Sequence, residues 1–230
     1  MGDYLILKLY GPMQAWGEHT FEGYRPSANL PSRSALLGLL GACLGIKRND
    51  RERQQQLAQS ICFAVCKEDR FLIRHSGKKY ALQTVKLVDY HTVKEARKDY
   101  TGLKTHETIQ TWREYLFDAF YTVAVWNIEP AFISLNELEQ AVKKPLFTPY
   151  LGRRCCPLSR PLFETRVVAE NAQTALWSMT SDSGTIYSEE QGAVRTIRMR
   201  DVPLVNQPRQ FASRNVYIYG GRNAFEQSND

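Results

Sequence analysis

The stretch TPYLGRRCCPLSRP, residues 148–161, places two cysteines after two arginines and between prolines, which raises metal binding and redox chemistry as options. Adjacent side chains diverge, so Cys155 and Cys156 cannot both reach one tetrahedral zinc ion without strain. Neither a CxxC motif nor a nearby histidine completes a ligand set. We therefore expect no metal and no cofactor here, and a redox pair is equally poorly supported.

The same stretch has the residues of a phosphate-binding loop. Gly152 lets the backbone approach a ligand closely, and Arg153 and Arg154 can offer paired donors to phosphate oxygens. Tyr150 could stack on a base. An ordinary structural role, with one arginine on an acid and one cysteine in the core, stays equally open on the motif alone.

Residues 86–113 are too long for an ordinary connection and too polar for a core element, so a functional or disordered segment is expected. Basic residues alternate there with aromatic and hydroxyl side chains, a mixture that suits single-stranded nucleic acid. Four acidic residues dilute the charge, so a surface for a partner protein is the rival interpretation.

Two histidines in this segment, His91 and His106, raise the possibility of metal-independent RNA cleavage, which needs a general acid and a general base with pKa values near neutrality. The spacing is a weak signal. The chain lacks HExxH, a P-loop and GxSxG, so we expect no enzyme activity and keep a metal-independent endoribonuclease as the alternative.

Positive charge is concentrated in two segments of a chain whose net charge is +6. Residues 143–166 and residues 192–222 each carry six Lys or Arg against one acidic residue. A polyanion-binding face needs such clustering, although a solvated charged surface would also account for it. The apolar runs are too short for a membrane span or a signal peptide, and five unpatterned cysteines fit reduced thiols, so we expect a cytoplasmic protein and no membrane contact.

Several elements can be placed from the pattern of apolar residues. The run at 3–10 predicts a strand buried on both faces, and 32–45 predicts a helix capped by Ser32 or Ser34 and ended by a glycine. A capping box predicts a second helix over 134–144. The stretch 51–60 predicts a short polar helix. Further strands are expected over 61–66, 71–75, 80–90 and 119–127, with 71–75 returning along 61–66.

Read in order, these elements resemble a βαββαβ ferredoxin-like palm that carries one large insertion, an α+β fold. The boundaries we expect are 1–85 and 114–160 for the palm and 86–113 for an inserted thumb. A small, mostly β C-terminal part is expected over 161–230. The sequence lacks the octapeptide K/R-G-F/Y-G/A-F-V-x-F/Y, with which RNA-recognition domains of this fold bind bases on the sheet. Any RNA should therefore bind away from the sheet.

Long motifs resemble one family over about residues 3–221. GPMQAWGEHTFEGYRP, PSRSALLGLLGACLGI, DYHTVKEARKDYTGLKTHETIQTWREYL, TPYLGRRCCPL and PRQFASR are similar to the CasD-type subunits of the type I-E CRISPR complex Cascade. The resemblance implies a noncatalytic subunit that grips the 5′ handle of the CRISPR RNA and caps the backbone filament in antiviral defence. Implied partners are the backbone subunit CasC, the large subunit CasA, other Cascade subunits, and target DNA through the complex.

The resemblance also implies which residues contact the handle. We expect phosphate clamping by the basic residues, and base or sugar contacts by Tyr150, His106 and Gln110. The full expected set is Arg25, Arg33, Lys104, His106, Gln110, Arg113, Tyr150, Arg153 and Arg154. Trp16 and Trp112 are expected to be packing residues, because buried tryptophan is common at the bases of loops.

Overall fold

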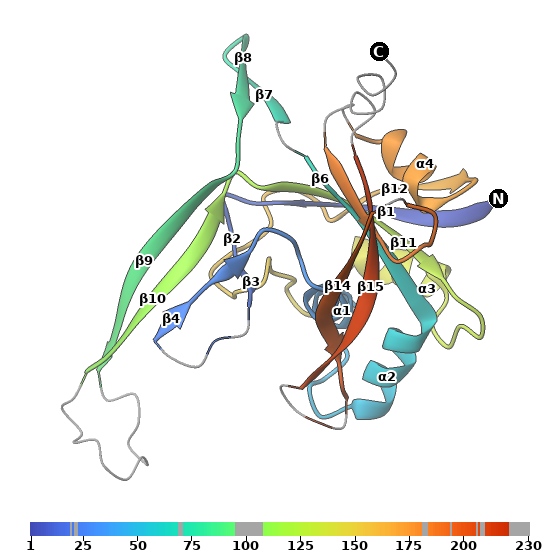
Figure 1. Cartoon of the computed structure of the whole chain (residues 1–230), viewed down its shortest axis with the longest axis horizontal. Coiled ribbons are helices and arrows are strands. Elements are labelled where there is room, and N and C mark those ends of the chain that lie inside the picture. The colour runs from blue at the N-terminus through green and yellow to red at the C-terminus, as the bar shows by residue number, and fades with distance from the viewer. Residues whose placement is uncertain are drawn as a thin grey trace.

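The computed structural model describes residues 1–18, 20, 23–68, 71–94, 108–180, 184–193, 195–205, 207 and 210–220. A large central sheet carries helices, and a long β-hairpin projects from it on one side (Figure 1). The helices are α1 (Arg33–Cys43), α2 (Arg51–Ser60), α3 (Leu135–Lys143) and α4 (Ala172–Trp177). None of the helices in these ranges is long and apolar enough to cross a membrane.

The strands follow in chain order and include several short pairs. They are β1 (Gly2–Tyr10), β2 (Met13–Gln14), β3 (Trp16–Gly17), β4 (Tyr24–Arg25), β5 (Ser27–Ala28), β6 (Ile61–Lys67), β7 (Phe71–His75), β8 (Lys78–Leu82), β9 (Val85–Lys94), β10 (Thr108–Phe117), β11 (Phe120–Asn127), β12 (Phe163–Ala169), β13 (Thr185–Ser188), β14 (Arg195–Pro203) and β15 (Phe211–Tyr219).

The central sheet has the order β12-β1-β11-β6-β13-β15-β14, with antiparallel neighbours throughout. Strand β1 is buried on both faces, as predicted. Leu5, Leu7 and Leu9 belong to the larger core, which includes residues of α1 and α3, whereas Tyr4 and Ile6 belong to a second core with residues of α4. Alternation along one strand therefore supplies both cores.

The helix ends agree with the predicted signals. Ser32 caps α1 by accepting a hydrogen bond from the Ala35 N–H, and Ser134 caps α3 by accepting one from the Glu137 N–H. Gly45 follows α1 with a φ of +70°, and a Cβ there would lie 2.7 Å from Leu146 Cδ1. The predicted stop at this glycine is confirmed, because the position needs both the left-handed conformation and the missing side chain.

The C-terminal segment, expected as a small, mostly β part over 161–230, contributes strands to the central sheet. Strand β12 lies beside β1, so the sheet continues past the predicted palm boundary at 160. Strand β13 pairs with β6 from Thr185↔Lys67 to Ser188↔Ala64, and β15 and β14 extend the same sheet. Sequence periodicity could not reveal this, because strand pairing over such separations leaves no local signal.

Two hairpins separate β6 from β11. Strand β7 pairs with β8 rather than with β6, and the predicted strand over 80–90 is divided between β8 and β9. Strands β9 and β10 pair antiparallel from Val85↔Phe117 to Lys94↔Thr108, forming the projecting arm (Figure 1). This arm is the predicted insertion with wider limits. Residues 95–107, and with them Lys104 and His106, lie outside the described residues.

Candidate nucleic-acid interface

The loop from Tyr150 to Pro157 is held rigidly against the N-terminal segment. Leu151 donates a backbone hydrogen bond to Cys156 at 2.8 Å, and Ala15 donates one to Leu151 at 3.1 Å. Gly152 has a φ of +85°, and a Cβ at this position would lie 1.8 Å from the Ala15 carbonyl oxygen. Only glycine fits, because both the conformation and the close contact exclude a side chain.

Arg153 reaches from this loop to the root of the arm. One guanidinium nitrogen donates to the Glu114 carbonyl oxygen at 2.9 Å and another to the Arg25 carbonyl oxygen at 3.1 Å. The guanidinium lies 4.7 Å from the centre of the Tyr115 ring. Within the described part of the chain it forms no ion pair, so its charge is held in place without a carboxylate beside it.

Arg25 and Arg113 are opposite each other in the parallel pairing of β4 with β10. Directly paired residues project from the same face of a sheet, and Tyr115 lies two residues after Arg113, so Arg113 and the Tyr115 ring share that face. Arg25 is exposed, and Arg113 donates from Nε to the Thr111 hydroxyl at 3.1 Å. Three predicted arginines, from three distant segments, therefore meet at one place.

The loop contributes two further exposed residues of the predicted set, and the arm contributes one. Tyr150 is 40% exposed, and Arg154 is also exposed, so both can reach a ligand. Gln110 is exposed on β10, but alternation places it on the opposite face from Arg113. The structure thus brings Arg153 to the arginine face, keeps Arg154 exposed on the same loop, and leaves Gln110 on the other side of the arm.

Arg33 requires a correction, because its guanidinium is used inside the fold. The residue is 7% exposed and donates two hydrogen bonds to Glu189, at 2.5 and 2.6 Å, and two to the carbonyl oxygens of Ala58 and Ile61. Its backbone N–H donates to Asp201 at 2.7 Å. The predicted contact of Arg33 with RNA is therefore wrong, since the residue is buried and its charge is paired with Glu189.

Other members of the two basic segments are also paired internally. Arg160 is bonded to Glu164, Arg166 to Asp3 and Glu139, and Arg214 to Asp201 and Glu189. Clustering in the sequence therefore overstates the charge available to a polyanion. Among the described residues, Arg153 and Arg154 of the first segment form no ion pair, and the same holds for Arg195, Arg198 and Arg200 of the second.

Glu114 and Tyr115, which the sequence did not single out, make contacts that hold the arm root and Arg153 in place. Glu114 is buried at the arm root, where its carboxylate accepts from the Ser27 N–H at 2.9 Å, from Lys86 at 2.9 Å, and from the Tyr24 hydroxyl. Burial alone would raise the pKa of Glu114, but these three donors outweigh it and lower the pKa. The ionised carboxylate therefore joins β4, β5, β9 and β10.

Burial raises the pKa of the Tyr115 hydroxyl, and the neighbouring Cys155 thiol raises that pKa further, so the hydroxyl is protonated at neutral pH. It lies 3.6 Å from Cys155 Sγ and 3.5 Å from His91 Nε2. The His91 Nε2 atom lies 2.7 Å from an Asp89 carboxylate oxygen. No group of three metal-ligating side chains occurs among the residues that the structure describes.

The opposite face of the arm carries a row of aromatic rings. Trp112 is paired in register with Tyr24 on one side and with Tyr90 on the other, and the three are 43%, 43% and 49% exposed. Trp112 and Tyr90 pack edge to face at 5.3 Å. The prediction that Trp112 is buried is wrong, whereas that for Trp16, 1% exposed, is confirmed.

Comparisons with known proteins agree with this geometry. A profile described as CRISPR-associated protein (Cas_Cas5) matches residues 4–217. The chain is 53% identical over 224 residues to a protein of Escherichia coli (strain K12) named CRISPR system Cascade subunit CasD, covering 96% of this chain and 97% of that one.

Solved structures give the same result. A chain from a CRISPR RNA-guided surveillance complex superposes with a TM-score of 0.69 at 27% identity, over 95% of this chain and 90% of that chain. A Cas protein crystal structure shares the fold with a TM-score of 0.60 at 22% identity, over 94% of both chains. The chain therefore belongs to the Cas5 family of CRISPR-associated proteins.

Proposed function

We propose that this chain is a noncatalytic RNA-binding subunit of a type I-E CRISPR surveillance complex, Cascade. In this proposal it grips the 5′ handle of the CRISPR RNA and caps the backbone filament, in contact with CasC, CasA and other Cascade subunits and, through the complex, with target DNA. The identity of 53% to a Cascade subunit supports the assignment to this complex. A cytoplasmic location follows from the same assignment.

The observation that carries RNA binding is the meeting of Arg25, Arg113 and Arg153 beside the rigid Gly152 loop. Guanidinium groups suit phosphate because their paired donors match its oxygens. Arg153 is pre-positioned by two carbonyl groups that accept hydrogen bonds but leave its charge without an acidic partner. A phosphate entering between loop and arm would therefore meet cations that are already ordered, so little side-chain entropy is lost on binding.

The fold suggests two parts with different roles in RNA binding, a palm and a thumb. We infer that β12, β1, β11 and β6, with the helices between them, form a ferredoxin-like palm and that the β9/β10 arm is the thumb. The order β12-β1-β11-β6 with connections through α1 and α3 supports this inference. A single strand bent between a fixed loop and a projecting arm would be recognised by its shape as well as by its phosphates.

The test uses Arg154→Ala in the assembled complex, because Arg154 is exposed and its removal breaks no described internal contact. We expect normal assembly, weaker retention of guide RNA, and a salt slope lower by about 0.7, the value for one lost phosphate contact on a single strand. Arg195→Ala, an exposed arginine on β14, is the matched control. Equal RNA retention in the two variants would contradict the proposal.

The cluster of Asp89, His91 and Tyr115 supports a second candidate, a metal-independent endoribonuclease. An Asp89 carboxylate oxygen at 2.7 Å and the Tyr115 hydroxyl at 3.5 Å both approach His91 Nε2, which groups a candidate acid–base residue with two polar partners on the arginine face. Incubation of the protein with labelled repeat RNA in chelator tests it. Specific cleavage that His91→Ala abolishes would favour the enzyme, and no cleavage would leave RNA binding alone.

A further inference from the structure

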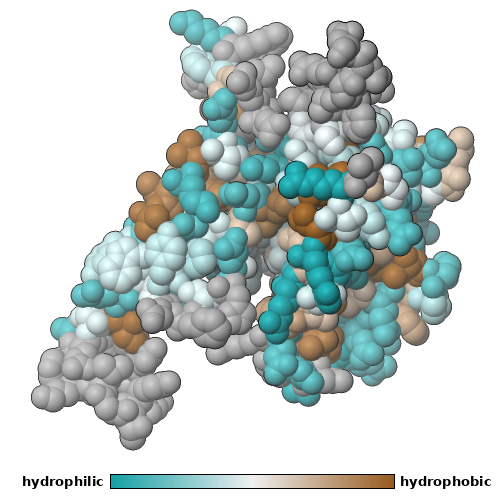
Figure 2. All heavy atoms as spheres, viewed as in Figure 1, coloured by the Kyte–Doolittle hydropathy of each residue, from teal (hydrophilic) through white to brown (hydrophobic). Residues whose placement is uncertain are grey.

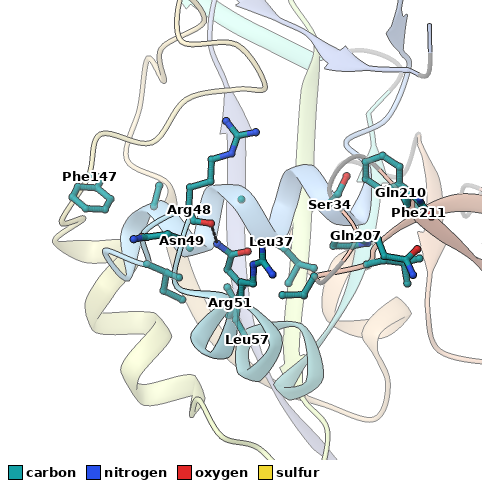
Figure 3. Close-up of a pocket in the computed structure, with 18 of the residues that line it drawn as sticks. Ser34, Leu37, Arg48, Asn49, Arg51, Leu57, Phe147, Gln207, Gln210 and Phe211 are labelled. Atoms are coloured by element: carbon teal, nitrogen blue, oxygen red, sulfur yellow. Dashed lines mark hydrogen bonds between the residues drawn. The ribbon is translucent and has the colours of Figure 1, made fainter. Parts of the chain in front are cut away.

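A groove with a volume of about 1060 Å³ lies between α1, α2, the segment 147–150 and the connection from β14 to β15. Figure 3 shows Phe147 at one end and Phe211 at the other, with Leu37 and Leu57 between them. Aromatic rings therefore stand at both ends of an apolar floor. This arrangement suits a flat ligand with apolar faces.

Gly38 opens the floor of the groove. It is exposed in the middle of α1, where glycine lowers helix propensity, and no heavy atom of the described residues lies within 4 Å of the position that its Cβ would take. In the same helix, a Cβ at Gly41 would lie in ordinary contact with Leu57 and Ile46, at 3.8 and 3.9 Å. The Gly38 position is therefore open where the Gly41 position is covered by the fold, so the backbone at Gly38 leaves room for a group from outside.

The polar lining of the groove has one chemical character. It contains two guanidinium groups and four carboxamides, and no acidic residue among the described lining residues; they are Arg48, Arg51, Asn49, Gln54, Gln207 and Gln210. A carboxamide presents a donor and an acceptor side by side, which matches the edge of a nucleobase. An apolar peptide would leave these groups without partners, whereas a nucleotide would pair with them.

The carboxamide of Gln54 is already held in place for pairing with the edge of a base. Gln54 donates both of its amide hydrogens, to the carbonyl oxygens of Lys47 at 2.9 Å and Arg48 at 3.0 Å. These bonds fix the side chain on the groove wall and leave its oxygen as an acceptor. Such a pre-positioned acceptor can select a base that offers an amino or imino hydrogen.

The groove is continuous with the loop that carries the arginines. Thr148 and Tyr150 line the groove, and Tyr150 is also the first residue of the rigid loop that positions Arg153. A strand whose phosphates lie on the loop would therefore pass the mouth of the groove. Its unstacked bases could turn inward past the Tyr150 ring.

We propose that this groove receives one or more unstacked bases of the RNA whose backbone is held at the Tyr150–Pro157 loop. The inference rests on the proposed RNA-binding function and adds a base-reading site to it. The base lies on the open backbone at Gly38, its faces contact apolar and aromatic side chains, and its edge pairs with the carboxamides. Arg48 and Arg51 contact the neighbouring phosphates.

The test fills the groove in the assembled complex with Gly38→Leu and uses Gln140→Leu, at an exposed position of α3 outside the groove, as the matched control. Gly38→Leu replaces a glycine inside a helix, so the Tm of this variant should equal or exceed that of the wild type. Base-modifying reagents then report which bases of the 5′ leader are protected. We expect at least one protected base in the wild type and in Gln140→Leu, and a rise of about tenfold in its reactivity in Gly38→Leu.

The possible results separate this inference from the proposed function. Unchanged base reactivity in Gly38→Leu, with RNA still crosslinked at the loop, would overturn the groove alone. If the wild-type complex gives no RNA crosslinks at the Tyr150–Pro157 loop, both the proposed RNA binding and the groove would be overturned. A photo-crosslinking amino acid in place of Phe147 completes the test, since capture of RNA supports the groove and capture of a peptide from another subunit overturns it.

Discussion

The central sheet and the arm are built from strands of similar length, but they bury very different fractions of their side chains. In β1 the six residues from Tyr4 to Leu9 are all buried, whereas in β9 nearly every residue is exposed. Figure 2 shows hydrophobic side chains exposed along the arm. Leu87 and Val88 of β9 are each 48% exposed. The sheet therefore completes its own core, whereas the arm exposes surface that suits contact with other molecules.

The largest expected change in the free energy of unfolding follows from a substitution of Arg33, which packs against the central sheet rather than on the arm. Arg33→Ala removes the donors to the Glu189 carboxylate and to the carbonyl oxygens of Ala58 and Ile61 in a buried site, so we expect the free energy of unfolding to fall by about 3–5 kcal/mol. Denaturant titration measures it. Arg113→Ala on the arm is the matched arginine, with a change below about 0.5 kcal/mol. Similar losses in both variants would remove the distinction between the two regions.

The next effect compares apolar truncations in the two regions. Leu7→Ala should lower the free energy of unfolding by about 2–5 kcal/mol, because Leu7 is 1% exposed and its loss leaves a cavity. Val88→Ala on the arm should change that free energy by less than about 0.5 kcal/mol. A large loss in Val88→Ala would mean that the arm contributes to the core after all.

Gly152→Ala tests the joint between the two regions. The added Cβ meets the Ala15 carbonyl and requires a left-handed backbone, so we expect a loss of about 1–3 kcal/mol and displacement of Arg153 from the arm. Differential scanning calorimetry and RNA retention in the complex report the two effects. Gly17→Ala, where nothing lies within 4 Å of the new Cβ, should leave both unchanged.

The smallest effect concerns pH at the arm root. Because the pKa of Glu114 is lowered in the folded protein, its contribution is complete above the ordinary glutamate pKa of about 4.3 and is lost as pH falls through the folded pKa. Glu114→Gln should lower stability by about 1–2 kcal/mol at pH 7. The difference in the free energy of unfolding between Glu114→Gln and the wild type should become smaller below a pH of about 4.3. A difference that stays constant with pH would contradict this prediction.

The elements that could be predicted are those marked by a signal within their own residues, such as an apolar run or a capping box. The continuous apolar run gave β1, and the Ser134 capping box gave the start of α3. The arm was predicted as an insertion, but of its strands only the first part of β9 was, within the strand expected over 80–90, because exposed strands do not alternate between apolar and polar residues. The continuation of the central sheet through β13 could not be predicted either, since it depends on pairing between residues more than a hundred positions apart.

The site was predicted in part for the same reason. Arg153 and Arg25 could be named from residue type and family resemblance, and the structure brings them together. Arg33 looked alike in the sequence, but its partner Glu189 lies 156 residues away and removes it from the surface. Tyr115 gave no signal because its role depends on Arg153 lying over its ring. Burial and pairing at long range decide which arginines stay available.

The pairing of β9 with β10 makes the reach of the arm adjustable. Thr92 lies directly opposite Gln110, so a two-residue turn could join the two strands at this point. Replacing 93–109 by such a turn would shorten the arm while keeping Glu114 and Tyr115 at its root. A graded series of such deletions would act as a molecular ruler for the distance that the arm has to span.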